Sequence, residues 1–402
     1  MSNYEKYLYK LNEIWHYAAK DMMNHLNLMF YIISIKGLID GNIVSDMIDI
    51  GDFEKIADAF KPDCSIDDIN TVKNASALIE KGFGLQHGFL DIISEYNNSP
   101  DYTRIIKELI SVTAELTLED NEYQELATYI LRRASNARCI SVRENVLSDG
   151  VADVLKVAAD VNEGDTVLDG SVGYGYGTLK YISMESNINL IGIEKNRCSA
   201  QIFALYMIIS GRQFSILRDD FISMTIDIKC DRIIMDTLIN GYNITDLTEH
   251  HLYLSEKWTE TKSCKNYYVY CIANALEGMK DDGRTIMIVP RGFLSDKRSG
   301  IASFRKNIIN RGLLKSVVAL PKIHNFTSID TALLIFEKNN REVLFMDSFS
   351  FFEKSSSHSY YFDEDGFGSI FKNEYEKEHI SCKIPLDKVL ETDNWNIDTF
   401  LK

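Results

Sequence analysis

Thr166-Val-Leu-Asp-Gly-Ser-Val-Gly-Tyr-Gly-Tyr-Gly177 is the stretch of sequence that decides the fold. A short apolar run leads into Asp169, and glycines at alternate positions follow it. Further along, Ile191-Gly-Ile-Glu194 is a second apolar run that ends in a carboxylate. Glycines let a backbone approach a ligand closely, and a carboxylate after the next strand can accept hydrogen bonds from a ribose diol. The pattern therefore predicts a strand, a glycine-rich turn and a second strand around a nucleotide-type cofactor.

Short apolar runs alternate with helical segments from about residue 139 onward. The runs lie at residues 166–168, 190–193, 214–217, 232–235, 284–289, 314–319 and 331–336. Helical patterns lie between most of them, for example Ser199 to Ser210 and Tyr267 to Met279. This alternation predicts an α/β fold with a doubly wound, mostly parallel, Rossmann-like sheet. The ligand is expected at the carboxyl ends of the strands.

The two ends of the chain have a different character. Residues 1–138 show helical periodicity and little strand signal, which predicts an N-terminal α-helical domain of four or five helices. Residues 139–347 form the predicted sheet domain. Residues 348–402 turn polar and aromatic and then acidic, so we expect a C-terminal tail rather than more sheet.

Composition limits the classes of function. With 402 residues, the chain is long enough for two or three domains. Its net charge of -16 argues against this chain alone having a large DNA-binding surface. Its apolar windows are too short to span a bilayer and its start lacks a signal-peptide pattern, so a cytoplasmic protein is expected. The 7 cysteines include no CxxC pair, so neither a metal site nor a disulfide framework is indicated.

The leading aspartate narrows the kind of cofactor. Dinucleotide sites follow G-x-G-x-x-G, whereas this loop follows D-x-x-x-G-x-G-x-G. An acidic residue ahead of the glycines suits a cationic ligand without phosphates, such as S-adenosylmethionine, and Glu194 and Asp220 at the ends of the next two strands support that assignment. The alternative is that the glycines only permit a tight connection from strand to helix.

The rest of the chain resembles one family within this class. The resemblance rests on the order of the cofactor motifs, on Ala273 to Leu294 and Val317-Val-Ala-Leu-Pro321, and on the two ends, Leu11 to Ala18 and Asp393 to Asp398. Together these segments look like the modification (M) subunit of type I restriction-modification systems, the adenine-N6 DNA methyltransferases. The resemblance covers nearly the whole chain.

Membership of that family would imply roles for individual residues. Asp169, Gly173 and Gly175 would surround the methionine part of S-adenosylmethionine. Glu194 would bind the ribose hydroxyls, and Asp220 would contact the adenine edge of the cofactor. The resemblance also implies DNA as the substrate and a separate specificity subunit as partner, and it leaves open a second M subunit and a restriction subunit.

The loop that would hold the target base in that family departs from the family pattern in this chain. Asn-Pro-Pro-Phe or Asp-Pro-Pro-Tyr is expected there, but the chain has Asp236-Thr-Leu-Ile239. Asp236 can still accept hydrogen bonds from an amine, and Tyr242 is the nearest aromatic side chain on which a flipped base could stack. The cofactor loop also has Asp169-Gly170 where the family has Asp-Pro, and Ile140 to Glu144 replaces a Thr-Pro-containing stretch.

These departures leave three functions open. The chain is an adenine-N6 methyltransferase with Asp236 and Tyr242 as catalytic residues, a catalytically silent relative that serves as a structural or cofactor-sensing subunit, or a methyltransferase with another substrate. Outside this constellation, the pair His250-His251 is expected to be solvated or at an interface, because adjacent helical positions point to different faces.

Overall fold

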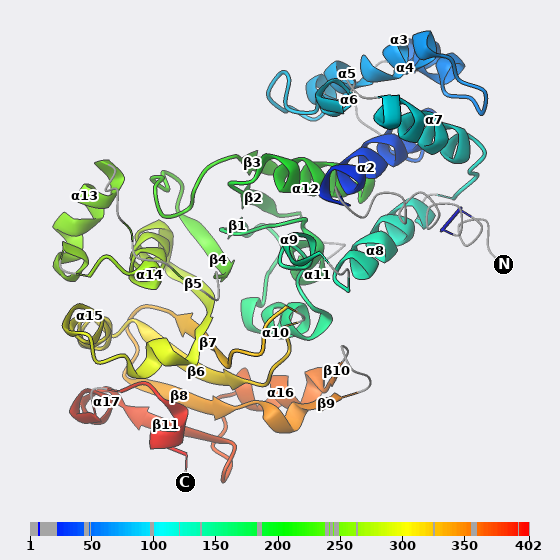
Figure 1. The fold of residues 1–402 in the computed structure, drawn as a ribbon. Helices are drawn as coiled ribbons and strands as arrows, with labels where there is room; N and C mark the ends of the chain where they lie inside the picture. The colour runs from blue at the N-terminus through cyan, green and yellow to red at the C-terminus, as the bar shows by residue number, and fades with distance from the viewer. Residues whose placement is uncertain are drawn as a thin grey trace. The chain divides into compact units, whose positions relative to one another are not determined.

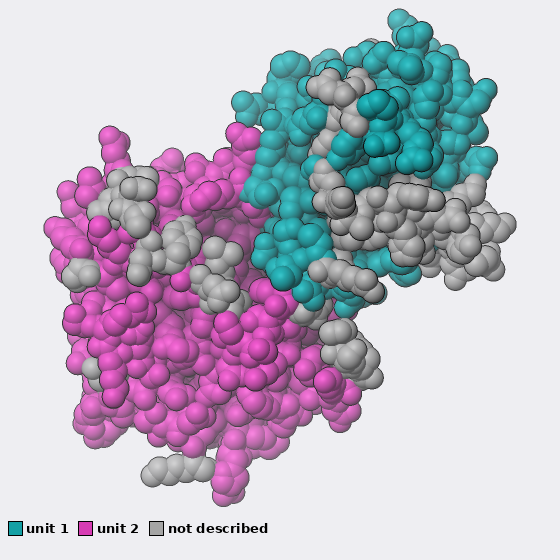
Figure 2. Space-filling model, viewed as in Figure 1, with its two compact units in different colours: residues 1–146, 173–175, 196–216 teal, residues 147–172, 176–195, 217–402 magenta. Residues whose placement is uncertain are grey.

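The computed structural model describes most of the chain and divides it into two compact units. The described residues are 7–8, 22–43, 48, 50–96, 100–119, 121–136, 139–182, 187–237, 241, 244, 249–262, 264–324, 326–354, 360–392 and 394–401. The first unit is Met1–Val146 with Gly173–Gly175 and Asn196–Ile216; the second is Leu147–Val172 with Tyr176–Lys195 and Leu217–Lys402. Figure 2 shows them in different colours.

The first unit is helical in the part that the structure describes. Its helices are α2 (Met22–Ile39), α3 (Ile50–Ala59), α4 (Ile66–Lys73), α5 (Ala75–Gly82), α6 (Ile92–Tyr96), α7 (Pro100–Ala114), α8 (Glu122–Ala134), α9 (Ile140–Arg143) and α12 (Arg197–Ile209). The N-terminal helices are shorter and more numerous than the four or five expected, since turns such as the one at Asn74 divide the periodic stretches. The periodic residues Leu11 to Ala18 lie outside the described residues.

Helix α2 forms the centre of this unit. It is apolar on every side, and Leu26 and Phe30 to Ile33 are fully buried because α2 packs against α7 and α12. Asn27 is also buried, and its Nδ2 donates to Oε1 of Gln201 on α12 at 2.6 Å. This bond satisfies a polar group that would otherwise be costly to bury.

The second unit is built on a large sheet with strand order β11-β8-β6-β7-β5-β4-β1-β2-β3. The strands are β1 (Thr166–Asp169), β2 (Asn189–Ile193), β3 (Ser215–Leu217), β4 (Cys230–Asp236), β5 (Met279–Pro290), β6 (Leu314–Leu320), β7 (Thr331–Phe336), β8 (Glu342–Asp347) and β11 (Ser381–Pro385). Neighbours from β2 through β1 and β4 to β5 are parallel, and β7 runs antiparallel between β5 and β6. Each of the apolar runs predicted as strands is one, and the α/β prediction is confirmed.

Residues beyond 347 add to the sheet, so the expectation of no further strand there is wrong. Strand β11 pairs antiparallel with β8, from Ser381 opposite Met346 to Pro385 opposite Glu342. A small hairpin of β9 (Phe352–Lys354) and β10 (Tyr360–Phe362) precedes it. An edge strand that pairs on one side needs no continuous apolar run, so its sequence signal is weak.

Helices cover both faces of this sheet. The helices are α10 (Asp149–Ala159), α11 (Tyr176–Tyr181), α13 (Glu249–Lys257), α14 (Tyr267–Gly278), α15 (Ser299–Asn310), α16 (Glu364–Phe371) and α17 (Leu386–Thr392). Figure 1 shows α14, α15 and α17 on one side of the strands and α10 and α16 on the other. This doubly wound arrangement places the candidate site at the carboxyl ends of β1, β2 and β4.

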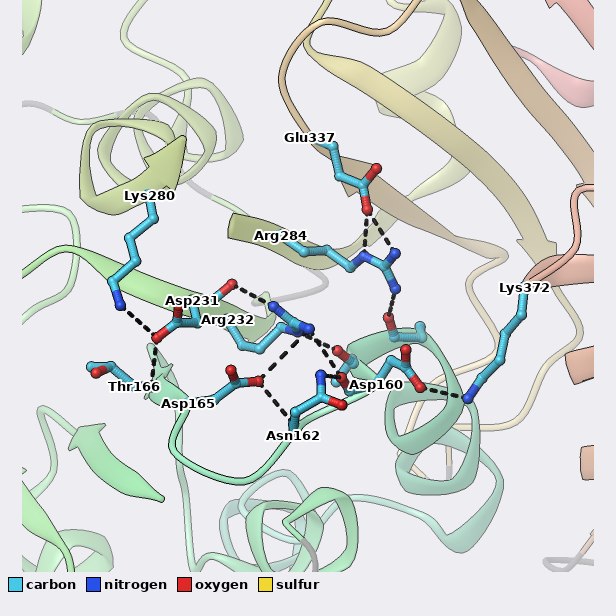
Figure 3. A network of polar contacts seen from close by, with 12 residues as sticks. Asp160, Asn162, Asp165, Thr166, Asp231, Arg232, Lys280, Arg284, Glu337 and Lys372 are labelled. Carbon is cyan, nitrogen blue, oxygen red and sulfur yellow. Dashed lines mark hydrogen bonds and ion pairs between the residues drawn. The ribbon is translucent and has the colours of Figure 1, made fainter. Parts of the chain in front are cut away.

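Two arginines bind the C-terminal end of α10 at the edge of the sheet opposite the carboxyl ends of β1 and β4. Arg232 on β4 donates from Nε to the carbonyl oxygen of Ala159 at 2.7 Å and from Nη2 to that of Asp160 at 3.1 Å. Arg284 on β5 donates to the carbonyl oxygen of Ala158 at 3.0 Å and pairs with Glu337 (Figure 3). Carbonyls at a helix C-terminus have no partner within the helix, so these bonds satisfy them and hold α10 just before β1.

Among the helices that the structure describes, none has the length and apolar character needed to cross a membrane.

Candidate functional site

Asp169 organises the loop between β1 and α11. It is buried, and its Oδ1 accepts a hydrogen bond from the backbone N–H of Ser171 at 3.0 Å. Its Oδ2 accepts from Oγ1 of Thr178 at 2.6 Å and from the hydroxyl of Tyr181. Burial raises the pKa of Asp169, and these hydrogen bonds oppose the rise. The carboxyl group is thus occupied by donors of its own loop and helix.

Gly173 and Gly175 are held in conformations that favour glycine. Their φ angles are +53° and +83°. A Cβ on Gly173 would lie 2.5 Å from the carbonyl oxygen of Asn145, and one on Gly175 would lie 2.7 Å from the ring of Phe203. Both glycines are therefore required by backbone conformation and close packing, whatever they contribute to a cofactor.

Glu194 and Asp220 lie at the ends of successive strands, as predicted. The backbone N–H of Glu194, just after β2, donates to the carbonyl oxygen of Leu217 at 3.1 Å. Asp220, just after β3, accepts from Nζ of Lys195 at 2.8 Å. Both carboxylates are half-buried, whereas the Lys195 side chain is 73% exposed, so that lysine can move aside without breaking the packed core.

The segment that follows Asp220 is held by Asn274 on α14. Its Nδ2 donates to the carbonyl oxygens of Phe221 at 2.6 Å and Met224 at 3.1 Å. Its Oδ1 lies 2.9 Å from Nε2 of His250. His250 and His251 are both buried, so the expectation of solvated histidines is wrong for this pair. Burial lowers the pKa of each histidine, which favours the neutral imidazole.

Asp236 ends β4, the strand next to β1. The hydroxyl of Ser171 in the glycine loop donates to its carbonyl oxygen at 3.0 Å, which joins the two candidate loops. Its side chain is mostly buried, and the buried Oδ1 has no hydrogen-bond partner among the described residues. Burial raises the pKa of Asp236 to about 8, and the nearby charge of Asp169 adds to the rise.

His324, which lies near Asp236, and Phe326, which contacts His324, were missed by the sequence analysis. Nδ1 of His324 lies 3.9 Å from Oδ2 of Asp236, and the ring of Phe326 lies 5.6 Å from that of His324. Both residues follow β6, and the predicted end of that strand at Ala319 is the signal that could have drawn attention to them. His324 is buried, whereas Phe326 is partly exposed.

The remainder of the loop that is expected to hold the base is described only in part. Thr237 is fixed to the sheet, because its hydroxyl donates to the carbonyl oxygen of Ile288 at 2.6 Å. The backbone N–H of Gly241 donates to the hydroxyl of Tyr268 at 2.9 Å. Residues 238–240 and Tyr242 lie outside the described residues, so the role of Tyr242 stays a prediction. In the described part of the chain, no group of His, Cys, Asp or Glu is placed to hold a metal ion.

Several solved structures share this fold. The type I restriction-modification methyltransferase subunit from Streptococcus thermophilus superposes with a TM-score of 0.79 over 100% of both chains, at 14% identity. A modification subunit assigned to a type I restriction enzyme of Vibrio vulnificus YJ016 gives 0.63, at 12% identity over 94% of this chain and 90% of that one. A chain from a structure of a type I R-M system gives 0.60, at 15% identity over 96% and 89%. At these identities the likeness concerns the fold.

A comparison with curated protein sequences gave no match. The sequence model of the family described as N-6 DNA Methylase, however, matches residues 150–401. The match includes Asp169, Glu194, Asp220 and Asp236 and extends through the C-terminal strand β11. Because it spans well over half of the chain and agrees with the sheet order and the site at its carboxyl edge, this protein belongs to the N-6 DNA methylase family.

Proposed function

We propose that the chain is a modification subunit that transfers a methyl group from S-adenosylmethionine to N6 of an adenine in DNA. The observation that carries the proposal is Asp236, a buried carboxyl group with an unpartnered oxygen among the described residues, bonded through its backbone to the glycine loop. This is where a family member needs an acceptor for the target amine.

The residues at the ends of β1, β2 and β3 fit the cofactor by their chemistry. Glu194 and Asp220 are half-buried carboxylates on successive strands, and carboxylates suit ribose hydroxyls and an adenine amine. Asp169, Gly173 and Gly175 would shape the loop around the methionine part, with Asp169 acting through its hydrogen bonds to the loop. S-adenosylmethionine, when bound, would supply the methyl group, and both electrons of the new N–C bond would come from the nitrogen.

Asp236 would position the amine and take up its proton. A carboxyl oxygen of Asp236 accepts a hydrogen bond from N6 and orients the nitrogen lone pair for attack. The nitrogen becomes positively charged as its new bond forms, and it must then lose a proton. With a pKa near 8, the carboxyl group becomes ionised, and able to accept that proton, as the pH rises toward and through 8. The partly exposed ring of Phe326 offers an apolar face for the base, in addition to the predicted face of Tyr242.

Sequence recognition would come from a separate specificity subunit. The net charge of -16 supports a separate DNA-binding partner, because an acidic chain repels the phosphate backbone of DNA unless a partner supplies positive charge. A second modification subunit and a restriction subunit are further partners to test.

The test has two steps. Calorimetric titration with S-adenosylmethionine is expected to show binding at one site, and Glu194→Ala is expected to weaken it. Transfer of a tritiated methyl group to DNA is then measured with the specificity subunit present. Asp236→Ala is expected to abolish transfer while leaving cofactor binding intact, and Asp330→Ala, which removes an exposed carboxylate, is the matched control. An absence of cofactor binding would contradict the proposal.

A catalytically silent scaffold is the second candidate, and one observation favours it. Thr237 stands where a proline is expected, so this part of the loop lacks the preset φ angle of proline. Its hydroxyl is instead hydrogen-bonded to the carbonyl oxygen of Ile288 in the sheet. Cofactor binding without transfer to DNA in the presence of the specificity subunit would support this candidate over the enzyme.

A further inference from the structure

Three buried polar atoms without a hydrogen-bond partner among the described residues belong to two neighbouring side chains at the carboxyl end of β4. They are Oδ1 of Asp236 and both ring nitrogens of His324. Nδ1 of His324 is 3.9 Å from Oδ2 of Asp236, which is too far for a hydrogen bond. Because unpartnered buried polar groups are unfavourable, such a cluster is typical of a site prepared for a ligand.

The position of His324 is set by its neighbours and leaves its ring nitrogens available. The carbonyl oxygen of Ile323 accepts a hydrogen bond from the hydroxyl of Ser148, at the start of α10. On the other side, the ring of Phe326 packs against the imidazole at 59°. The imidazole is thus held by the backbone before it and by a ring contact after it. Neither contact uses a ring nitrogen.

The protonation of His324 defines what it can recognise. Burial lowers the pKa of His324 to about 4, so the ring is neutral at physiological pH. A neutral imidazole has one N–H donor and one nitrogen acceptor, and the carboxyl group of Asp236 presents an acceptor oxygen whether it is ionised or protonated. The pair therefore complements an edge with a donor and an acceptor side by side. An amino group next to an unprotonated ring nitrogen has that pattern.

We propose that His324 is a specificity-determining residue that donates its N–H to the ring nitrogen beside the amino group held by Asp236. The inference rests on the proposed function, since Asp236 is the acceptor for the target amine there. Adenine and cytosine carry an amino group beside an unprotonated ring nitrogen, whereas uracil and thymine carry carbonyls. The two side chains together select the class of base, while a partner subunit selects the sequence around it.

Nuclear magnetic resonance of the histidine ring nitrogens tests this inference directly. The full-length chain is labelled with ¹⁵N-histidine and saturated with S-adenosylhomocysteine, which keeps nucleosides out of the cofactor site. The His324 signals are assigned with His324→Gln, and the exposed His379 is the internal reference. Adenosine, 1-deazaadenosine, 7-deazaadenosine and uridine are titrated separately.

Adenosine is expected to move the His324 signals and leave those of His379 in place. One of the two deaza analogues is expected to have no such effect, because it lacks the nitrogen that accepts the bond, and uridine is expected to have none. In the same titration, followed at the nucleoside, His324→Phe is expected to weaken adenosine affinity by about tenfold. His324→Gln, which keeps a donor, is expected to weaken it less.

Two results would overturn the inference. One is that adenosine leaves the His324 signals unchanged. The other is that both deaza analogues or uridine move them as much as adenosine does. Binding of S-adenosylhomocysteine is measured first by calorimetry, and its absence would contradict the proposed function. Calorimetry therefore tests the proposed function, and the nucleoside titrations test the role of His324 separately.

Discussion

A carboxyl group in the position of Asp236 makes the stability of the protein depend on pH in an uncommon direction. Its pKa rises from 3.8 to about 8, because burial and the charge of Asp169 disfavour the ionised form. The native state therefore keeps a proton that the unfolded chain releases in this range. The stability that this group contributes is fully present below about pH 4 and is lost as the pH rises through 8.

Asp236→Asn is expected to be more stable than the wild type at pH 8 because it removes the buried ionisation. The gain should be on the order of 1–3 kcal/mol and should shrink as the pH falls toward 4. Free energies of unfolding in urea, measured at several pH values, check this. Asp330→Asn, which changes an exposed carboxylate, is the matched control. A pH-independent effect of Asp236→Asn would contradict the burial argument.

Gly173 offers a second prediction for a single residue. Its φ is +53°, and a Cβ at this position would lie only 2.5 Å from the Asn145 carbonyl oxygen, so backbone conformation and packing both oppose a side chain. Gly173→Ala is therefore expected to destabilise the protein by about 1–3 kcal/mol. Gly292→Ala is the control, because a Cβ there meets no atom within 4 Å and φ is not positive. Equal denaturation midpoints for the two variants would show that the loop relaxes freely.

At the scale of elements, the C-terminal end of α10 depends on the arginines of Figure 3. Arg284→Leu would leave the carbonyl oxygen of Ala158 and the carboxylate of Glu337 without this partner, at a cost of about 1–3 kcal/mol. Arg298→Leu is the control, since that arginine is 61% exposed and pairs with the nearby Asp296 at the surface. Urea denaturation midpoints measure both. A loss no larger than that of the control would mean that water replaces the arginine at little cost.

The sheet was predictable where its strands are buried on both faces. Val167, Leu168 and Ile233 belong to short apolar runs, because a central parallel strand must be apolar throughout. Ser381 to Pro385 could not be recognised in the same way, since β11 pairs only with β8 and mixes polar with apolar residues. Patterns within one segment do not report which distant strand it will join.

The candidate site was predictable only where its residues lie at the ends of strands that the sequence pattern locates. Glu194, Asp220 and Asp236 end strands that the pattern locates, so their place at the sheet edge follows from the parallel order. His324 was missed because its meeting with Asp236 depends on β6 lying two strands from β5, with the antiparallel β7 between them. That strand order is set by tertiary packing and cannot be predicted from the spacing of residues within one segment.

On the scale of the whole molecule, charge governs how the chain meets DNA. Its 59 acidic and 43 basic residues give a net charge of -16, so counterion release cannot drive association with duplex DNA. We expect no retention of duplex DNA by the chain alone between about 50 and 200 mM salt. With its specificity subunit, affinity for a duplex with the target site should rise about 1,000-fold or more. Fluorescence anisotropy with labelled duplexes measures both, and a duplex without the site is the control. Binding by the chain alone that weakens steeply with salt would contradict this expectation, because it would require a basic surface that overrides the overall charge.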